Sequence, residues 1–325
     1  MKILFIGGTG IISSACVKLA SEQNRDIHLL VRGLSTDKRP IPAGIKIFNG
    51  DINDEAQATR FFEENQFDVV VNWVAFTPDQ VKRDIRLLQG KVSQYVFISS
   101  ASAYQKPIKQ LPITEETPLE NPYWEYSRNK KACEEVLLKA FQEKGFPVTI
   151  VRPSHTYDKT LLPFDGGYTI VDRILKGKPV IIHGDGTSLW VLTHHEDFAR
   201  GFVPLLGNPA AKGETFHITS DMLLNWNQIF EITAAAFGAD LLTVHVPSEV
   251  IARYNAEWGA SLLGDKSHSV IFDNSKIKTF VPDFKAFIPF SDGIKEVAAW
   301  YQYKDKQIVD HSVSEMIDQI VEDWS

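Results

Sequence analysis

The amino terminus constrains the fold of this chain more than any other segment. Residues 2–6 (KILFI) form a short apolar run that predicts a buried parallel strand. The run ends in Gly-Gly-Thr-Gly at 7–10, and helix-forming sequence follows from about residue 14 to residue 23. Glycines at such a turn let the backbone approach a pyrophosphate, which the free N–H groups of the new helix can bind. The three segments together predict a nucleotide-binding unit, with a purely structural glycine turn as the alternative.

Further apolar runs of strand length alternate with helical sequence. The predicted strands cover residues 27–31, 45–48, 69–73, 95–98 and 148–151. Helix starts are well marked, since Thr77 is followed by proline and then by Gln80, a capping pattern that recurs at Asn225. This alternation predicts an α/β protein with a Rossmann-type, doubly wound parallel sheet.

The pattern loosens beyond Arg152, where loops such as 162–167 are rich in Gly and Pro. We therefore expect residues 1–157 to form the dinucleotide-binding domain and 158–325 to form mainly a smaller substrate-binding domain. Residues 214–218 look like a strand that returns to the main sheet. The C-terminal domain is accordingly predicted to be discontinuous, with return segments near 187–220.

Tyr126 and Lys130 carry the strongest chemical signal. They lie four residues apart in a segment that leads into a predicted helix, so they share one helix face. A free tyrosine titrates near ~10 and is a useful general base at neutral pH only if something lowers its pKa. An ammonium one turn away can favour the phenolate. A chance pairing on a solvated helix face is the alternative for this motif taken alone.

A second signal lies at the end of the strand 95–98. Ser99 and Ser100 follow it, and in open α/β sheets ligands bind beyond the carboxyl ends of the strands. Ser100 is therefore expected on the same edge as the glycine turn. Satisfaction of strand-end backbone groups is a sufficient explanation for Ser99 and Ser102.

These motifs resemble those of the extended short-chain dehydrogenase/reductase family, the NAD(P)-dependent epimerases and dehydratases. The resemblance covers most of the chain, is specific through about Tyr157, and places Ser13 at the third glycine position. It implies that Ser100, Tyr126 and Lys130 are the catalytic residues. It also implies cofactor contacts from Gly7, Gly10, Ile11, Ile12, Arg32, Asp51, Ile52, Val74, Ser99, Tyr126, Lys130 and Pro153.

Departures from the family pattern bear on the substrate. Dehydratases of the family carry an Asp-Glu pair directly after the catalytic hydroxyl, where this chain has Ala101 and Ser102. Members that use nucleotide sugars usually place an arginine where this chain has Trp190, and His155 replaces a usual asparagine. These changes argue against dehydration and predict a pocket reshaped away from nucleotide diphosphates.

Several aromatic and histidine side chains could line that pocket, and we expect two or three of them to touch the ligand. The seven candidates are Trp73, Tyr123, Trp124, His155, Tyr157, Trp190 and His194, of which Trp73, His155, Trp190 and His194 are the predicted substrate residues. His194 and His195 precede Glu196 and Asp197, a spacing that fits a helix start better than a metal-ligand set. No metal site is predicted.

Arg32 bears on the choice of cofactor. It ends the second predicted strand, where NAD-specific relatives place an acidic residue that binds the ribose hydroxyls. Its guanidinium can pair with a 2′-phosphate, and Ser35, Lys38 and Arg39 could add to the positive field. We therefore expect both NAD and NADP to bind, with NADP preferred. An exposed arginine without influence on the cofactor is the alternative.

Composition narrows the partners and the location. The formal net charge of −7 argues against a nucleic-acid partner. The apolar runs are too short to span a membrane, and the amino terminus lacks the pattern of a signal peptide. Cys16 and Cys133 are predicted to be core thiols. A cytoplasmic location is expected, and the resemblance implies a homodimer formed through helices 77–89 and 123–141.

The sequence thus predicts an NAD(P)-dependent oxidoreductase or epimerase acting by hydride transfer on a small-molecule substrate, a secondary alcohol or sugar-like compound. It leaves the substrate and the reaction direction open. Two alternatives remain. An RNA-binding relative like the chloroplast stem-loop binding proteins is disfavoured by the acidic charge and by the intact Ser100, Tyr126 and Lys130. A redox-sensing regulator would typically have lost the tyrosine or the lysine.

Overall fold

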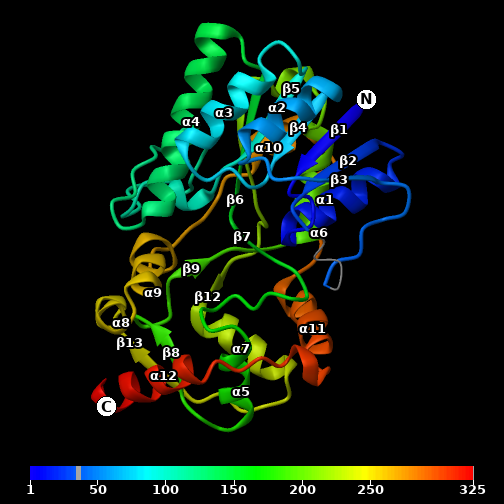
Figure 1. The fold of residues 1–325 in the computed structure, drawn as a ribbon. Coiled ribbons are helices and arrows are strands. Elements are labelled where there is room, and N and C mark those ends of the chain that lie inside the picture. Colours follow the sequence, from blue (N-terminus) through cyan, green and yellow to red (C-terminus); the bar gives the residue numbers. More distant parts are fainter. Residues whose placement is uncertain (34–37, 325) are drawn as a thin grey trace.

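A seven-stranded parallel sheet forms the centre of the larger part of the molecule (Figure 1). The computed structural model describes residues 1–33 and 38–324. The strand order is β3-β2-β1-β4-β5-β6-β11. The strands are β1 (Lys2–Ile6), β2 (Asp26–Val31), β3 (Lys46–Asn49), β4 (Val69–Asn72), β5 (Gln94–Ile98), β6 (Val148–Pro153) and β11 (Thr215–Ile218).

Helices cover both faces of this sheet, which confirms the predicted doubly wound class. One face packs against α1 (Ile11–Glu22), α6 (His195–Phe202) and α10 (Ser275–Phe280). The other packs against α2 (Glu55–Glu64), α3 (Pro78–Leu88) and α4 (Glu125–Lys144). Successive side chains of a strand point to opposite faces, so β1 contributes Ile3 and Phe5 to the first core and Leu4 and Ile6 to the second.

The predicted helix starts at Thr77 and Asn225 are confirmed, and both residues form capping boxes. The first helix was predicted too late, because α1 begins at Ile11 rather than near Ser14. Ser13 explains the difference. Its hydroxyl accepts a hydrogen bond from the Gly10 N–H (2.8 Å) and donates one to the Gly7 carbonyl (3.0 Å). The glycine turn is thereby braced from within the first helical turn, and the helix starts directly at its end.

The return of the chain to the sheet is also confirmed. β11 pairs in parallel with β6 at the sheet edge. Just beyond β6, β7 (His155–Tyr157) pairs in parallel with β10 (Leu192–His194), which leads directly into α6. The β11–β6 and β10–β7 pairings bring the segment around residues 190–195 beside the carboxyl ends of the central strands.

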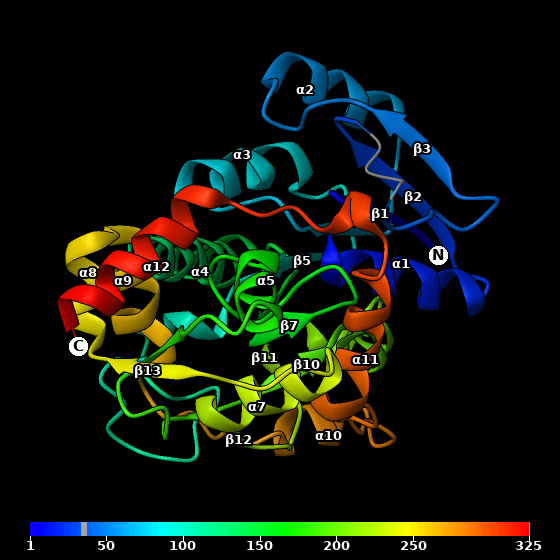
Figure 2. The same cartoon turned by 90° about the horizontal axis from the view of Figure 1, so that it is seen from below.

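The segments predicted to form the smaller domain pack around a third core, which lies on both sides of β11 in the sequence and also includes Ala101, Tyr104 and Ile113. Figure 1 shows these segments below the sheet, and Figure 2 shows α12 alongside α5, with which it is in contact. Their elements are α5 (Tyr168–Leu175), β8 (Val180–His183), β9 (Leu189–Trp190), β12 (Leu224–Asn225), α7 (Trp226–Ala236), β13 (Thr243–Val246), α8 (Ser248–Tyr254), α9 (Ala256–Ser261), a π-helical turn (Leu262–Lys266), α11 (Phe290–Trp300) and α12 (His311–Trp324).

Short 3₁₀ turns complete the described structure, at Ala101–Ala103, Val203–Leu205, Pro209–Ala211 and Lys304–Lys306. Cys16 and Cys133 lie buried in α1 and α4 as free thiols, as predicted. Across residues 1–33 and 38–324, no helix is both long enough and apolar enough to cross a membrane.

Candidate active site

Two cavities lie along the carboxyl edge of the central sheet. The larger has a volume of about 940 Å³ and is bordered by the glycine turn and the ends of β1, β2 and β4. Of the predicted cofactor residues, it brings together Gly7, Gly10, Arg32, Asp51, Ile52 and Val74. The smaller has a volume of about 340 Å³ and lies between the sheet edge and the second domain.

The glycine turn fits a dinucleotide. Gly7 has a φ of +85°, and a Cβ there would come within 2.6 Å of Val74 Cγ1, so only glycine suits the position. The first N–H groups of α1 have no intrahelical partners, as at every helix start, and Gly10, the residue just before the helix, borders the same cavity. Backbone donors, a close approach and a long cavity are what a bound pyrophosphate requires. The residues present therefore fit NAD or NADP.

Three basic residues line this cavity, and one of them, Arg39, does not contribute the free positive charge that was expected. The Arg32 side chain is 75% exposed, and its Nη1 lies 3.8 Å from Asp51 Oδ2, so it remains available to a ligand. Arg39 also lines the cavity, but its largely covered side chain forms an ion pair, with Nε 2.5 Å from Asp158 Oδ2 and a further hydrogen bond to Thr160. Its charge is already compensated, so it adds little to the field. Lys38 borders the cavity, and Ser35 lies outside the described residues.

Lys130 lies buried beneath the site on α4. Its Nζ donates to the carbonyls of Ala75 and Ile98, both at 2.8 Å, and lies 4.5 Å from the centroid of the Phe76 ring. Burial lowers the pKa of Lys130 to about 8. The ammonium is therefore the main form at neutral pH, and two carbonyls fix its position.

Tyr126 lies one turn before Lys130, as predicted, but its pKa does not shift in the expected direction. Burial raises the Tyr126 pKa, a hydrogen bond with Ser100 acts against this, and the Asp265 carboxylate raises it further. Lys130 Nζ lies 5.7 Å from the ring centroid, and its bonds to the Ala75 and Ile98 carbonyls hold it off the phenol oxygen. Desolvation of the phenolate outweighs the nearby cation in this arrangement.

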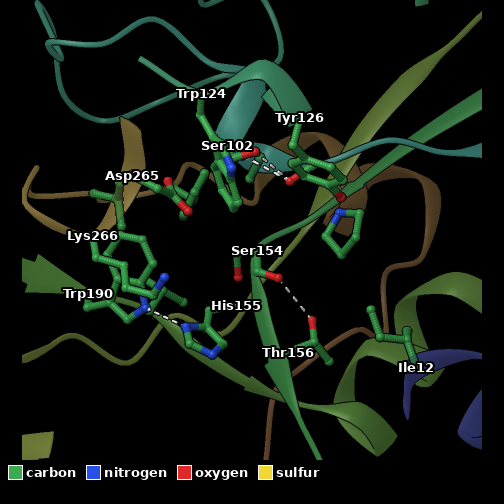
Figure 3. A pocket seen from close by; sticks show the side chains of 16 residues that line it. Ile12, Ser102, Trp124, Tyr126, Ser154, His155, Thr156, Trp190, Asp265 and Lys266 are labelled. Atoms are coloured by element: carbon green, nitrogen blue, oxygen red, sulfur yellow. Dashed lines mark hydrogen bonds between the residues drawn. The ribbon is translucent and has the colours of Figure 1, made fainter. Parts of the chain in front are cut away.

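Figure 3 shows the smaller cavity, with Tyr126 and Trp124 on one wall and His155 and Trp190 on another. Ser100, Ile12 and Pro153 also line it. Together with Tyr126, His155 and Trp190 they make six predicted site residues in this cavity. Trp124, His155 and Trp190 are the three of the seven candidate aromatics and histidines that reach the cavity. The complete lining is Ile12, Ser100, Ala101, Ser102, Trp124, Tyr126, Pro153, Ser154, His155, Thr156, Trp190, Val191, Asp265, Lys266, Val270 and Phe272.

Two predicted substrate residues lie elsewhere. Trp73 packs into the core under α6, with its ring 6.2 Å from that of Phe5 and 5.2 Å from that of Phe202. His194 is buried at the start of α6 and meets Tyr157 edge-on at 5.4 Å. Trp73 is turned toward Phe198 and Phe202 of α6, and neither Trp73 nor His194 lines the cavity.

Two predicted cofactor residues also turn away from the cavities. Ser99 is buried and donates to Glu134 Oε1 (2.5 Å), because alternate residues beyond β5 face opposite sides. Ile11 does not line either cavity, and its carbonyl accepts a hydrogen bond from His195 Nδ1 (3.1 Å). Any contact from Ile11 to a cofactor would have to come from its backbone N–H.

Five polar residues of the smaller cavity were missed by the sequence analysis: Ser102, Ser154, Thr156, Asp265 and Lys266. Ser154 and Thr156 follow β6 and could have been found by the strand-end rule that selected Ser100. Asp265 and Lys266 come from the π-helical turn, which carries no motif.

Within the described ranges, no group of three or more His, Cys, Asp or Glu residues could hold a metal ion.

Residues 3–219 match the NAD dependent epimerase/dehydratase family. The chain belongs to this family. Its fold and motifs therefore agree with the resemblance inferred from the sequence, and the family's dependence on NAD agrees with the shape of the larger cavity.

Other members of the epimerase/dehydratase family and related proteins show how varied its relatives are. The chain is 26% identical to 2'-dehydrokanamycin reductase of Streptomyces kanamyceticus, over 82% of this chain and 72% of the relative. It is 25% identical to a chloroplast stem-loop binding protein of Arabidopsis thaliana, over 92% and 74%. UDP-glucose 4-epimerase of Thermus thermophilus, solved with NAD, has a similar fold, with a TM-score of 0.74, 18% identity, and coverage of 93% and 99%.

The buried histidines of this family member predict acid sensitivity. Burial and Lys266 lower the pKa of His155 to about 3, and burial lowers that of His183 to about 4. Between those values and about 6.5 the unfolded chain binds the protons and the folded chain does not. The free energy of unfolding should therefore fall as pH drops below about 6.5, by up to ~1.4 kcal/mol per pH unit for each histidine.

Urea unfolding at several pH values tests this expectation. His155→Gln should have a shallower pH dependence than the unmodified chain, whereas the control His311→Gln, at an exposed position, should leave it unchanged. Equal slopes for the unmodified chain and both variants would contradict the assignment.

Proposed function

We propose that this family member oxidises a secondary alcohol, or reduces the corresponding ketone, on a small sugar-like molecule. When bound, NAD or NADP would accept or donate the hydride. The observation that carries the proposal is that Tyr126 and Ser100 line the same smaller cavity, with Lys130 buried one helical turn after Tyr126. Phe76 lines the larger cavity, and its ring lies 6.4 Å from that of Tyr126. Tyr126 in the smaller cavity is therefore next to a residue that lines the larger one.

The roles of the three residues follow from their positions. Tyr126 takes the hydroxyl proton of the alcohol as general base and returns it in the reverse direction. Ser100 hydrogen-bonds the substrate oxygen, where charge changes during the reaction. Lys130 supplies a fixed positive charge behind the ring. Because the pKa of Tyr126 is raised, the positive charge of Lys130 has to favour the phenolate more strongly when substrate is bound.

The residues after Ser100 favour redox chemistry over dehydration. Removal of water needs an acid and a base beside the substrate, and the two positions hold Ala101 and Ser102. Ser102 is a poor substitute for either, because an alkyl hydroxyl is a weak acid and a weak base near neutral pH, and its hydrogen-bond partners are only the hydroxyls of Ser100 (2.9 Å) and Ser127 (2.8 Å). The relative from Streptomyces is named as a reductase, which supports the same choice.

The size of the smaller cavity favours a substrate without a nucleotide. Its volume of about 340 Å³ lies near the lower end of the ~300–1,000 Å³ range of ligand pockets. Trp190 occupies the position of the usual arginine, and an indole cannot form a bidentate contact with phosphate. We therefore propose a free sugar, or an alcohol of similar size, rather than a nucleotide diphosphate sugar.

A substrate screen tests this function. The protein is incubated with each oxidised cofactor and with secondary alcohols, free sugars and nucleotide sugars, while the near-ultraviolet absorbance of reduced nicotinamide is followed. We expect turnover with a compound that lacks a nucleotide. Highest turnover with a nucleotide sugar, supported by micromolar binding in calorimetry, would contradict the proposed substrate class.

We further propose a preference for NADP, because Arg32 is exposed and only loosely associated with Asp51. Arg32→Asp should weaken NADP binding by at least about tenfold, the effect of losing one charge-assisted hydrogen bond, and should leave NAD binding unchanged or tighter, because an acidic residue here can bind the ribose hydroxyls. Dissociation constants for both cofactors measure this. Lys82→Asp is the control, since Lys82 is exposed on α3 outside the cavity lining. Equal or tighter NAD binding by the unmodified chain would show that Arg32 does not bind the phosphate.

A second candidate function comes from the Arabidopsis relative, which is named for binding a stem-loop. The net charge of −7 opposes such a role for this chain, because binding to a phosphate backbone depends on clustered basic residues. Retention on an RNA column at moderate salt, without turnover of any cofactor, would favour the RNA-binding alternative.

A further inference from the structure

Trp190 and His155 form a fixed pair in the wall of the smaller cavity. The indole Nε1 donates to His155 Nδ1 over 3.1 Å, and the two rings meet edge-on with 6.1 Å between centroids. Trp190 is 3% exposed and packs against Trp226 at 5.4 Å. The donor is therefore held in place by its own packing (Figure 3).

This hydrogen bond determines where the proton of His155 lies. An indole nitrogen can only donate, so Nδ1 of His155 has to be the acceptor. In a neutral imidazole the single proton then resides on Nε2. The low pKa of His155, caused by burial and by Lys266, keeps the ring neutral at physiological pH. Trp190 thus selects one tautomer of His155.

The remaining nitrogen has no partner within the protein. No residue within 1–33 or 38–324 forms a hydrogen bond with His155 Nε2, although the side chain lines the cavity. An Nε2–H without a partner is a donor available to whatever fills the space. An asparagine, by contrast, could turn its amide and offer either a donor or an acceptor.

We propose that His155 is a specificity-determining residue that donates a hydrogen bond from Nε2 to an oxygen of the substrate, and that Trp190 is the positioning residue that fixes this donor. The inference rests on the proposed function, because it concerns the substrate of the same site. A hydroxyl, carbonyl or carboxylate oxygen can accept this bond. An ammonium group cannot, since it has no lone pair. The site therefore selects for an oxygen substituent at this point of the substrate.

Nitrogen-15 NMR of histidine-labelled protein tests the tautomer without any substrate. His155→Gln identifies the His155 resonances by their loss. We expect the Nε2–H form in the unmodified chain and a mixture of tautomers in Trp190→Phe, which keeps an aromatic ring but removes the indole donor. Trp124→Phe is the matched control, because Trp124 lines the same cavity but donates to Glu257 instead. It should leave the signal of His155 unchanged. An Nδ1–H form in the unmodified chain would overturn the proposal.

Steady-state kinetics test the role in recognition, using the compound with the highest turnover in the substrate screen. His155→Leu should raise KM by about tenfold with kcat within about twofold, and His155→Gln, which keeps an N–H donor, should recover part of this loss. A role confined to packing would leave KM unchanged in a folded His155→Leu variant, and that result would overturn the proposal. Absence of turnover with every compound would overturn the proposed function and the recognition role together, while the NMR result would still decide the tautomer.

Discussion

Tyr126→Phe is expected to lower kcat by about a thousandfold, within the ~10²–10⁴ range typical of general acid–base catalysis. The phenol is the proton acceptor, and its removal leaves Ser100 and Lys130 without a group that can take the proton. Cofactor binding should change little, because the ring contacts survive. Tyr126 packs against Trp124 at 5.0 Å and Phe76 at 6.4 Å through its ring. Turnover at saturating cofactor and the cofactor dissociation constant measure the two effects.

A second tyrosine provides the control for this experiment. Tyr303 is 65% exposed in the smaller domain, far from the cavity lining, and Tyr303→Phe should leave both quantities unchanged. A Tyr126→Phe protein that keeps more than about a tenth of the activity would lie outside the range expected for loss of a general base. The proton acceptor would then have to be sought elsewhere in the cavity.

Glu134→Ala is expected to destabilise the protein by about 3–5 kcal/mol, the cost of leaving a buried charge without its partner. Arg152 forms a two-fold contact with Glu134, through Nη2 to Oε2 at 2.5 Å and Nε to Oε1 at 2.9 Å. Both side chains are at most 5% exposed. Ser99 adds a third hydrogen bond to the same carboxylate. The substitution leaves the guanidinium of Arg152, a residue of β6, buried without its carboxylate partner.

The neighbouring residue supplies a matched control. Glu135 lies on the same helix and pairs with Lys131 at 3.6 Å, but both side chains are exposed. Glu135→Ala should change the free energy of unfolding by less than about 1 kcal/mol. Urea unfolding of the two variants at neutral pH makes the comparison. Similar losses from both substitutions would show that burial of the Arg152 pair does not set its contribution.

Local rules account for the parts of the site that the sequence could predict. The strand, glycine turn and helix at residues 2–22 follow from short-range pattern, and the placement of Tyr126 and Lys130 follows from helical periodicity. Ser100 was placed by the rule for strand ends, and it does line the smaller cavity. In each case the deciding contacts lie within a few residues of the motif.

Long-range packing accounts for the parts that the sequence could not predict. Trp73 directly follows β4, but its side chain is covered by Phe198 and Phe202 of α6, which starts more than a hundred residues later in the chain. His194 ends β10 and packs against Tyr157 instead of the cavity. Asp265 and Lys266 reach the cavity from the second domain after the chain has returned through β11. The spacing of apolar residues in the sequence does not indicate which of these side chains a distant segment would cover.

The charge balance around Tyr126 is a further example. The spacing of Tyr126 and Lys130 predicts a lowered pKa for the tyrosine, whereas burial and the Asp265 carboxylate raise it. Desolvation depends on every element that surrounds the phenol, and Asp265 comes from the other domain. The spacing of two residues on one helix indicates neither the desolvation of the phenol nor the effect of Asp265.

Transfer of deuterium from substrate to cofactor tests whether this site performs hydride transfer. The preferred alcohol from the substrate screen is labelled with deuterium on its carbinol carbon and is mixed with excess protein and oxidised cofactor for a single turnover. Mass spectrometry then locates the label. We expect the deuterium to be recovered in the reduced cofactor, and we expect Tyr126→Phe to suppress this transfer while Tyr303→Phe does not. Conversion of the alcohol with the label retained on carbon, or released to water, would contradict hydride transfer as the chemistry of this site.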